Sequence, residues 1–338
     1  MRQPTMTDIA RRAGVSRIAV SYALNGRPGV SDALREQIVG IAQELGYRAN
    51  GNALALHGAA AKAFGLVMLR SSAAFTVEVF RRRLIAGIQT ELSARGFGLA
   101  LQFVADLDEE VAVHRRWAAE QRVDGVLIVD PVPDDPRLAA LQRIGLPVVV
   151  VGGTRAMRGV WSDDSAAMTE VVDHLRGLGH RRIARVSGPA GLVHTEARDA
   201  AFRRAGAEVV IVRGDYTGDS GARLTRELLG RADRPTAVVY DNDVMAIAGL
   251  GAAHDLGLAV PADVSIVAGE DSPLCQVVGP PLTVVKRDIV GFGAQAARML
   301  FEILETGSAT SLPATTGHLE IRRSTGPAAS VTGTPRTE

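Results

Sequence analysis

Residues 5–50 read TMTDIARRAGVSRIAVSYALNGRPGVSDALREQIVGIAQELGYRAN, and this stretch decides the fold of the start of the chain. A first helix is predicted over Asp8–Ala13, because its apolar residues share one face and its charged residues share the other. Thr7 is its expected N-cap, and Gly14 suits a left-handed C-terminal stop. Ser16 suits the cap of the next helix, so a very short turn joins the two helices.

The second predicted helix, Arg17–Asn25, carries the functional signal. Its apolar arc consists of Ala19, Val20, Ala23 and Leu24. The opposite arc holds one cation, two hydroxyls, one amide and one aliphatic side chain, which are Arg17, Ile18, Ser21, Tyr22 and Asn25. An arginine can donate two hydrogen bonds to guanine, an aliphatic group can touch a thymine methyl, and hydroxyls or amides can reach phosphate. This face therefore suits a DNA groove.

A third helix is predicted over Asp32–Leu45 after the cap Ser31, so that the three apolar faces form one small core. The alternative is a three-helix bundle whose polar face is merely solvated. The charge distribution favours the DNA interpretation. Residues 1–60 hold seven arginines and four acidic residues, a net charge of +3, whereas the remainder holds 31 basic and 33 acidic residues. A basic head on a slightly acidic body is expected when only the head meets a polyanion.

Residues 5–50 resemble the N-terminal signature of the lactose-repressor (LacI/GalR) family of bacterial regulators. The resemblance lies in A-G-V-S at the turn, L-N-G after the second helix, V-S before the third and L-G-Y at its end. It implies that Arg17, Ile18 and Tyr22 read base edges in the major groove. It also implies that phosphates are held mainly by Thr5, Ser16, Ser21 and Asn25.

The resemblance further predicts a hinge after the third helix. In the family this segment becomes a short helix on DNA, and a leucine from each protomer enters the minor groove. Leu56 stands at that place, with Asn50 and Ala53 as further DNA contacts in the same segment. The alternative is that Leu56 only covers a linker contact. Ala49 replaces the usual proline, and Gly51 costs a helix about 1 kcal/mol relative to alanine, so we expect a hinge that depends on DNA for its order.

From Ala63 onward, short β-branched runs alternate with amphipathic stretches, which predicts an α/β fold with parallel sheets covered by helices on both faces. The strands expected in a first lobe are Phe64–Leu69, Leu99–Val104, Gly125–Val129 and Pro147–Val151. Those expected in a second lobe are Arg182–Ser187, Glu208–Val212, Thr236–Tyr240 and Val264–Ala268. Crossovers between the lobes are expected near Gly152–Val160, Pro273–Val284 and Ser308–Thr316.

The family resemblance continues, less tightly, over Gly65–Arg323, with LGHRRIA at 178–184, DNDVMA at 241–246 and VPADVSIV at 260–267. It implies a two-lobed, periplasmic-binding-protein-like domain behind the N-terminal helix-turn-helix domain. The expected divisions are residues 1–49 for DNA binding, 50–62 for the hinge and linker, 63–323 for effector binding and dimerisation, and 324–338 for a disordered tail low in hydrophobic residues.

Open parallel sheets bind ligands beyond the carboxyl ends of their strands, so the candidate effector residues lie in loops that follow strands. They are Phe80, Arg81, Asp130, Arg198, Asp243 and Asp271. Carboxylates accept hydroxyl protons, arginine donates to ring or hydroxyl oxygens, and an aromatic ring stacks on a sugar face, so this set suits a neutral polyhydroxy ligand. By position the resemblance supports Arg198, Asp243 and Asp271, while Arg81 replaces the usual aromatic partner of Phe80. The alternatives are helix caps for the last two aspartates and a surface salt bridge for Arg198.

These observations predict a sequence-specific DNA-binding transcription regulator that binds a palindromic duplex operator as a homodimer. The family resemblance implies a repressor of a sugar-utilisation operon that is released by a small sugar-like effector, and corepression is the alternative. We expect no enzyme activity, cofactor or metal, because the sequence has no phosphate loop, catalytic set or metal-ligand spacing. It has no membrane-spanning apolar run and no secretory signal, so a cytoplasmic protein without a membrane partner is expected. The rival interpretations are a solute-binding protein with the same two-lobed body and a sugar-modifying enzyme.

Overall fold

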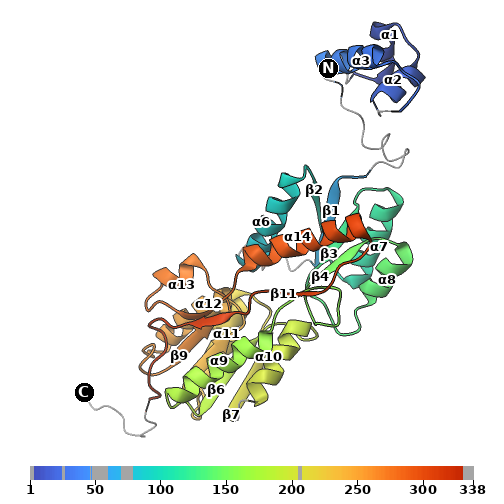
Figure 1. Ribbon diagram of the computed structural model, residues 1–338. Coiled ribbons are helices and arrows are strands. Elements are labelled where there is room, and N and C mark those ends of the chain that lie inside the picture. Colours follow the sequence, from blue (N-terminus) through green and yellow to red (C-terminus); the bar gives the residue numbers. More distant parts are fainter. Residues whose placement is uncertain are drawn as a thin grey trace. The chain divides into compact units, whose positions relative to one another are not determined.

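The computed structural model describes residues 4–24, 27–45, 47, 60–69, 79–204 and 208–329. The chain forms two compact units, Met1–Ala61 and Lys62–Glu338 (Figure 1). The boundary expected at residue 49 and the hinge stay predictions, because residues 48–59 lie outside the described part of the chain. The predicted DNA contacts that also lie outside it are Asn25, Asn50, Ala53 and Leu56.

The described residues of the smaller unit form three helices: α1 Met6–Ala13, α2 Arg17–Leu24 and α3 Asp32–Glu44. Their apolar faces meet in one core, in which Ile9, Val20 and Ile38 are fully buried. Gly14 ends α1 in the left-handed conformation, at φ 68°, as its position in the sequence predicts. The helix-turn-helix arrangement therefore forms as the periodicity predicts.

The N-terminal cap of α1 differs from the expected one. The helix begins at Met6, and its cap is Thr5 rather than Thr7. The Thr5 N–H and hydroxyl both donate to Oδ2 of Asp8, at 2.9 and 2.6 Å. Because a carboxylate three residues along can accept both hydrogen bonds, the helix starts earlier than its amphipathic pattern indicates.

The first lobe of the larger unit is built on a parallel sheet of order β11-β5-β4-β3-β1-β2. Its strands are β1 Ala63–Leu69, β2 Gly98–Val104, β3 Gly125–Ile128, β4 Val148–Gly153, β5 Gly159–Trp161 and β11 Leu312–Pro313. Its helices are α6 Val79–Ala94, α7 Leu107–Ala119, α8 Pro136–Ile144 and α14 Ile289–Thr306. Phe64, Leu66 and Met68 of β1 face α6 and α14, whereas Val67 faces α7 and α8, so alternate residues of one strand serve two cores.

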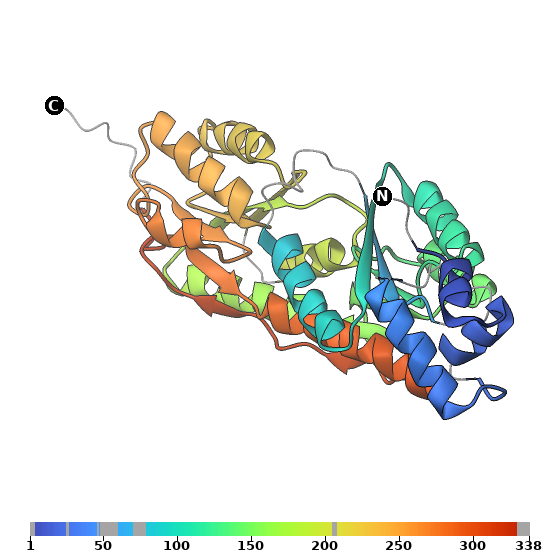
Figure 2. The same cartoon turned by 90° about the horizontal axis from the view of Figure 1, so that it is seen from above.

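Helices α6 and α14 lie side by side in both ribbon views (Figures 1 and 2). A side chain added at Gly87 would collide with the carbonyl of Val290, and one at Gly293 would collide with the carbonyl of Leu84. These two glycines thus let the helix backbones approach each other closely. The pairing brings a helix from late in the chain onto the first lobe.

The second lobe contains a sheet of order β12-β10-β9-β8-β6-β7, which is parallel except for β12 against β10. Its strands are β6 Arg182–Ser187, β7 Glu208–Arg213, β8 Ala237–Tyr240, β9 Ser265–Ala268, β10 Thr283–Lys286 and β12 His318–Glu320. Its helices are α9 Asp164–Gly177, α10 Val193–Arg204, α11 Gly218–Leu229, α12 Asp243–Asp255 and α13 Pro273–Val277. Helices α9 and α10 cover one face of this sheet, and α11, α12 and α13 cover the other.

The chain passes between the lobes three times within the described residues, and two crossings differ in place from those expected. The three crossings lie between β5 and α9, between β10 and α14, and between β11 and β12. The first two follow the expected segments, because β5 still belongs to the first sheet and β10 to the second. Both strands are too short to give a clear alternation in sequence. The third crossing, at residues 314–317, overlaps the expected segment.

The expectation of a disordered tail from residue 324 is wrong for its first residues. Ser324 is fully buried, where its hydroxyl accepts from the Thr283 N–H at 2.8 Å and donates to the Ile266 carbonyl at 2.6 Å. The Gly326 N–H donates to the Ser265 hydroxyl at 3.1 Å. Polar residues can thus be ordered by the backbone groups of a neighbouring sheet, although their composition is typical of disorder.

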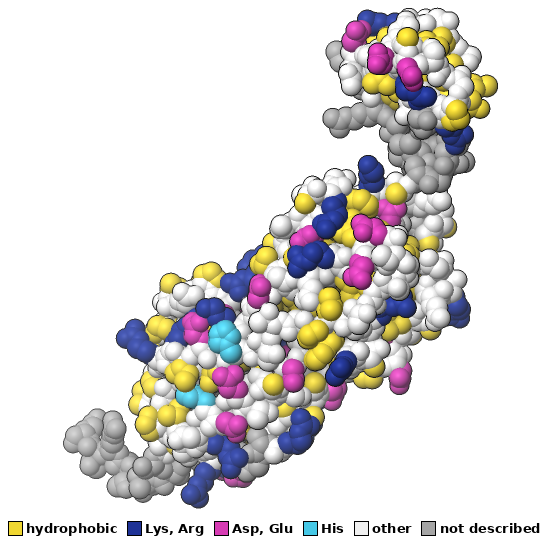
Figure 3. All heavy atoms as spheres, in the orientation of Figure 1, with side chains coloured by type: hydrophobic (Ala, Val, Ile, Leu, Met, Phe, Trp, Pro, Cys, Tyr) yellow, Lys and Arg dark blue, Asp and Glu magenta, His cyan; other side chains and the backbone are white. Residues whose placement is uncertain are grey.

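On the face of the larger unit seen in Figure 3, basic and acidic side chains are interspersed rather than gathered by sign. This agrees with the near-balanced charge of the chain after residue 60. Among the described helices, none has the length and apolar character needed to cross a bilayer.

Candidate DNA-reading and effector sites

The outer face of α2 presents the predicted base-reading residues to solvent. Arg17 is exposed, Ile18 is 66% exposed and Tyr22 is 36% exposed, whereas Val20 and Ala23 are buried against the other helices. A large aliphatic side chain exposed to this extent beside a cation and a phenol suits a surface that meets a partner. The structure therefore brings the three predicted readers onto one open face.

Helix α2 is held at both ends by side chains. At its start, the Ser16 hydroxyl accepts from the Ala19 N–H at 3.1 Å, as a cap does. At its end, the Arg35 guanidinium of α3 donates to the carbonyls of Tyr22 and Ala23 at 3.3 and 3.1 Å. The sequence reasoning did not find Arg35, because the contact joins two helices and leaves no mark in the local pattern.

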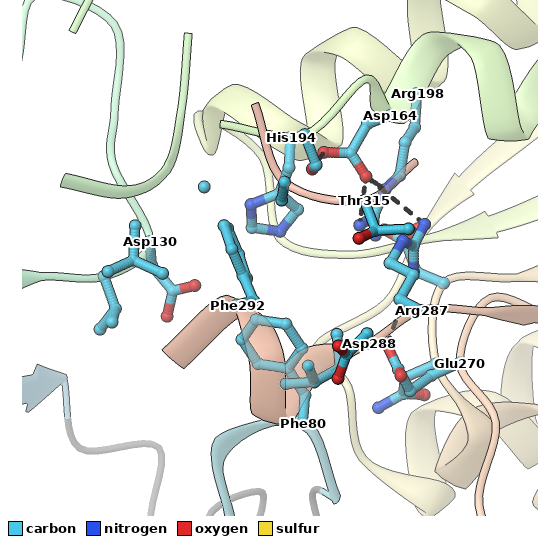
Figure 4. A pocket seen from close by; sticks show the side chains of 18 of the residues that line it. Phe80, Asp130, Asp164, His194, Arg198, Glu270, Arg287, Asp288, Phe292 and Thr315 are labelled. Atoms are coloured by element: carbon cyan, nitrogen blue, oxygen red, sulfur yellow. Dashed lines mark hydrogen bonds and ion pairs between the residues drawn. The ribbon is translucent and has the colours of Figure 1, made fainter. Parts of the chain in front are cut away.

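A pocket opens at the carboxyl ends of strands of both lobes. It has about 880 Å³ of space, including the part open to solvent. Its lining side chains with polar or aromatic character are Phe80, Asp130, Ser162, Asp164, His194, Arg198, Tyr216, Asp241, Asn242, Asp243, Glu270, Arg287, Asp288, Phe292 and Thr315. In the close view, Phe80 and Phe292 lie between Asp130 on one side and Arg198, Asp164 and Arg287 on the other (Figure 4). The pocket therefore combines aromatic surface with many hydrogen-bonding groups.

Arg198 is fixed by two carboxylates rather than left mobile. Its Nε donates to Asp164 Oδ1 at 2.8 Å, and its NH1 donates to Asp241 Oδ1 at 3.1 Å. Its NH2 also lies 2.7 Å from Asp164 Oδ1. Burial would raise the pKa of Asp164, but the guanidinium groups of Arg198 and Arg287 lower it to about 2. These groups stay ionised, so the arginine is oriented before any ligand arrives.

The ion pairs continue behind the pocket wall. Arg185 is fully buried, and it donates to Asp199 at 2.8 Å and to Asp241 at 2.7 Å. Asp241 therefore joins Arg185 to Arg198. Burial would raise the pKa of Asp241, but these two arginines lower it below its usual range.

Two carboxylate oxygens of the pocket are buried without a partner among the described residues, Oδ1 of Asp243 and Oε1 of Glu270. Burial raises the pKa of Asp243, and it raises the pKa of Glu270 to about 7 against the opposing effect of Arg287. A buried acceptor without a donor is unfavourable. Both side chains line the pocket, although these two oxygens themselves lie beneath its surface.

Known proteins resemble both parts of the chain. Residues 5–50 match the family described as bacterial regulatory proteins, lacI family, and residues 172–325 match a periplasmic binding protein-like domain. The chain is 33% identical over 340 residues to the HTH-type transcriptional regulator CelR of Thermobifida fusca, covering 96% of this chain and 98% of the relative. It is 32% identical over 340 residues to the HTH-type transcriptional regulator AglR of Rhizobium meliloti (strain 1021), covering 96% and 94%.

The chain belongs to the LacI family of bacterial regulatory proteins. It is a DNA-binding transcriptional regulator, so the solute-binding and enzyme interpretations no longer stand. A solved CelR–cellobiose complex is similar, with a TM-score of 0.71 and 31% identity over 95% of this chain and 99% of that chain. A LacI family regulator from Bifidobacterium animalis subsp. lactis gives a TM-score of 0.73 and 33% identity over 80% and 99%. The lac repressor dimer bound to operator, at 24% identity and a TM-score of 0.83 over 96% and 100%, shows the same fold.

Four of the six predicted effector residues of this LacI-family chain line the pocket: Phe80, Asp130, Arg198 and Asp243. Arg81 is not among the lining residues, but its NH2 donates to Asp130 Oδ2 at 3.0 Å. Asp271 is also not among them, because its carboxylate is held by both terminal nitrogens of Arg322 at 2.9 and 3.0 Å. The structure thus assigns Asp271 to an ion pair rather than to the pocket.

The alternatives to a ligand role fare differently from residue to residue. Asn242 caps α12 through the Met245 N–H at 2.9 Å, so Asp243 is not the cap of that helix. Ser272 holds the cap position of α13, so Asp271 is not a cap either. The Arg198 side chain is only 12% exposed, which excludes a simple surface salt bridge.

The sequence reasoning missed several lining residues of the LacI-family pocket. Asp241 and Glu270 follow the recognised strands β8 and β9 within two residues, and the rule that selected Asp243 applies to them equally. Asp164 and Arg287 follow β5 and β10, which had not been recognised as strands. His194 and Tyr216 bond to each other at 2.9 Å, and no local signal marks them.

Proposed function

We propose that the pocket binds a neutral, hydroxyl-rich sugar, and that binding releases the protein from a palindromic operator to which it binds as a homodimer. The observation that carries the proposal is a pocket lined by carboxyl, hydroxyl and amide side chains beside two aromatic rings, Phe80 and Phe292. Sugar hydroxyls donate to carboxylates, and the apolar face of a sugar ring stacks on an aromatic ring. The CelR–cellobiose complex, a relative with a sugar bound, supports the same ligand class.

The charge of the pocket argues against an anionic effector. Its lining includes six carboxyl residues and two arginines. Both arginines already face Asp164, at 2.7 Å from Arg198 and 3.4 Å from Arg287. A phosphate or carboxylate on the ligand would therefore meet more negative than positive charge. A neutral sugar avoids this repulsion.

We infer that Arg17, Ile18 and Tyr22 read base edges, whereas Ser16 and Ser21 contact phosphates. The Ser16 hydroxyl accepts from Ala19, which leaves its own proton available for a phosphate oxygen. Thr5 is a weaker candidate, because its N–H and its hydroxyl both donate to Asp8. A phosphate contact by Thr5 requires one of these bonds to be given up.

The experiment is an operator titration with purified protein. Fluorescence anisotropy measures binding to a palindromic fragment from upstream of its own gene, alone and with cellobiose, other neutral sugars or a sugar phosphate. We expect one neutral sugar to weaken operator binding and to bind the protein directly in calorimetry. Asp243→Asn should weaken the sugar response and leave operator binding in the absence of sugar unchanged.

Three results would contradict parts of the proposal. If no neutral sugar binds, or if only the sugar phosphate does, the ligand class is wrong. If the sugar strengthens operator binding, the ligand acts as a corepressor and release is wrong. If the operator complex contains one protomer on each palindrome, the homodimer is wrong.

A further inference from the structure

The first lobe contains a second buried ionic group, which does not line the pocket. Arg137 of α8 is 1% exposed, and Glu110 of α7 and Asp135 are also buried. The Arg137 guanidinium donates to Asp135 through Nε at 2.9 Å and through NH2 at 2.6 Å, and to Glu110 Oε2 through NH1 at 3.0 Å. Three ionisable side chains are costly to bury, so their retention calls for a reason other than stability alone.

The remaining contacts of Arg137 are to backbone of the pocket wall. Its NH1 donates to the carbonyl of Val129 at 3.2 Å, and its NH2 donates to the carbonyl of Asp130 at 3.1 Å. Val129 and Asp130 both line the pocket, directly after β3. Asp130 has φ 50°, in the left-handed region that non-glycine residues seldom adopt. The guanidinium thus holds a strained loop from inside the lobe.

Asp135 accepts hydrogen bonds from backbone groups farther along the same loop. Its Oδ2 accepts from the Val132 N–H at 3.2 Å, and its Oδ1 accepts from the Arg137 N–H at 3.0 Å. Asp135 is also the N-cap of α8. One carboxylate therefore fixes the loop, the helix start and the arginine together.

The outer side of the same loop contacts the pocket and the second lobe. The Asp130 carboxylate accepts a hydrogen bond from NH2 of Arg81 in α6 at 3.0 Å. The Pro131 carbonyl accepts from the N–H of Val193 at 2.9 Å, and Val193 is the first residue of α10, next to the lining residue His194. Residues 129–131 thus connect the buried ionic group, the pocket and the second lobe.

We propose that Arg137 is a positioning residue for the effector site. By holding the carbonyls of residues 129 and 130, it directs the Asp130 side chain toward the ligand and sets the Pro131 carbonyl against the second lobe. It does so without touching the ligand. This inference rests on the proposed function, because it takes the pocket to be the effector site.

The first test separates positioning from general stability. Arg137→Lys keeps the positive charge, but a single ammonium cannot reach both carboxylates and both carbonyls. Val113→Ala is the matched control, since Val113 of α7 belongs to the apolar core of the same lobe rather than to the ionic group. We expect Arg137→Lys to weaken sugar binding about 10-fold or more, because small displacements of a contact group have large effects. Val113→Ala should change it less than about 2-fold, and operator binding without sugar should be unchanged in both.

A double-mutant cycle identifies the residue through which Arg137 acts. In an Asp130→Ala background the side chain to be positioned is gone, so Arg137→Lys should add less than about a 2-fold further loss. An equal loss in both backgrounds would overturn the positioning role through Asp130. So would an effect of Val113→Ala as large as that of Arg137→Lys.

Two further measurements keep the test decisive if no sugar binds or if Arg137→Lys does not fold. Amide hydrogen exchange in the protein without ligand should rise at residues 129–135 and 193–195 in Arg137→Lys and not in Val113→Ala. Val193→Pro removes the N–H that bonds to Pro131, at a helix position where proline is tolerated. It should raise exchange at residues 129–132 without altering the core of the first lobe. Unchanged exchange in both variants would contradict the inference even if the pocket proved to bind no sugar.

Discussion

The exposed face of α2 and the wall of the pocket both present arginine, but they hold it in opposite ways. Arg17 projects into solvent from a helix whose inner face is a small apolar core. Arg198 is clamped between Asp164 and Asp241, and Asp241 is held in turn by the buried Arg185. A solvated arginine can adjust to the phosphates and bases of a long partner. A clamped arginine is ordered during folding, so binding a small ligand does not have to order it again.

The largest expected effect comes from breaking the buried ion pairs that Arg185 makes with Asp199 and Asp241. Arg185→Ala leaves the carboxylates of Asp199 and Asp241 short of a partner inside the second lobe. We expect the free energy of unfolding of the larger unit to fall by about 3–5 kcal/mol, as when one member of a buried ion pair is removed. Urea unfolding followed by circular dichroism measures the loss.

A surface pair supplies the control for this prediction. Arg223 pairs with Glu227 one turn along α11, and both side chains are more than half exposed. Arg223→Ala should cost less than about 1 kcal/mol. Equal losses in the two variants would mean that the clamp does not differ from a surface salt bridge.

An intermediate effect is expected from acid. The pKa of Asp164 is about 2 in the folded protein and near 3.8 in an unfolded chain, because Arg198 and Arg287 outweigh the effect of burial. Between these values the folded state binds fewer protons than the unfolded state, so stability falls as the pH falls. The contribution is present above about pH 4, is lost toward pH 2, and amounts to roughly 2 kcal/mol.

The measurement is the free energy of unfolding from pH 6 down to the acid transition, in the natural protein and in Asp164→Asn. The natural protein should lose stability more steeply below pH 4, since the amide variant has no proton to bind at this position. Parallel curves would show that Asp164 does not supply the acid sensitivity.

The remaining effect is expected on the exposed side of the comparison, in DNA affinity rather than in stability. Arg17→Ala should weaken binding to the specific operator by about 1–3 kcal/mol, the range for loss of one arginine contact to a base. It should leave the unfolding of the smaller unit almost unchanged, because the side chain is exposed. Anisotropy titrations with operator and with unrelated duplex of the same length measure the ratio of the two affinities.

Arg11→Ala is a control of equal charge, on α1 and 77% exposed. It should weaken binding to operator and to unrelated duplex alike and so preserve the ratio of the two affinities, as loss of a nonspecific electrostatic contact does. If Arg17→Ala also preserves the ratio, Arg17 contacts phosphate rather than bases.

The two regions also differed in how far the sequence could predict them. The face of α2 follows from a single helical period, so the exposure of Arg17, Ile18 and Tyr22 could be predicted from neighbouring residues alone. Their role as base readers was predicted from the family resemblance instead. In the pocket, the rule that ligands lie beyond strand ends located the correct loops but not always the correct residue within them. Asp271 was chosen from one loop, whereas Glu270 lines the pocket there.

The reason for that error lies far along the chain. Asp271 is bound by Arg322, which follows β12, and this pairing across 51 residues has no local signal. Asp164 was missed because β5 is only three residues long and shows no clear alternation. Contacts made by short edge strands and by distant ion pairs are settled by packing, which a single sequence does not display.

The crossings between the lobes carry a consequence for how this regulator can change over evolutionary time. They supply Ser162, Arg287, Asp288 and Thr315 to the lining of the pocket. A substitution that alters ligand preference at any of these positions also alters a segment that connects the two lobes. Descendants can therefore seldom exchange one ligand for another at these positions without also changing how the two lobes are connected.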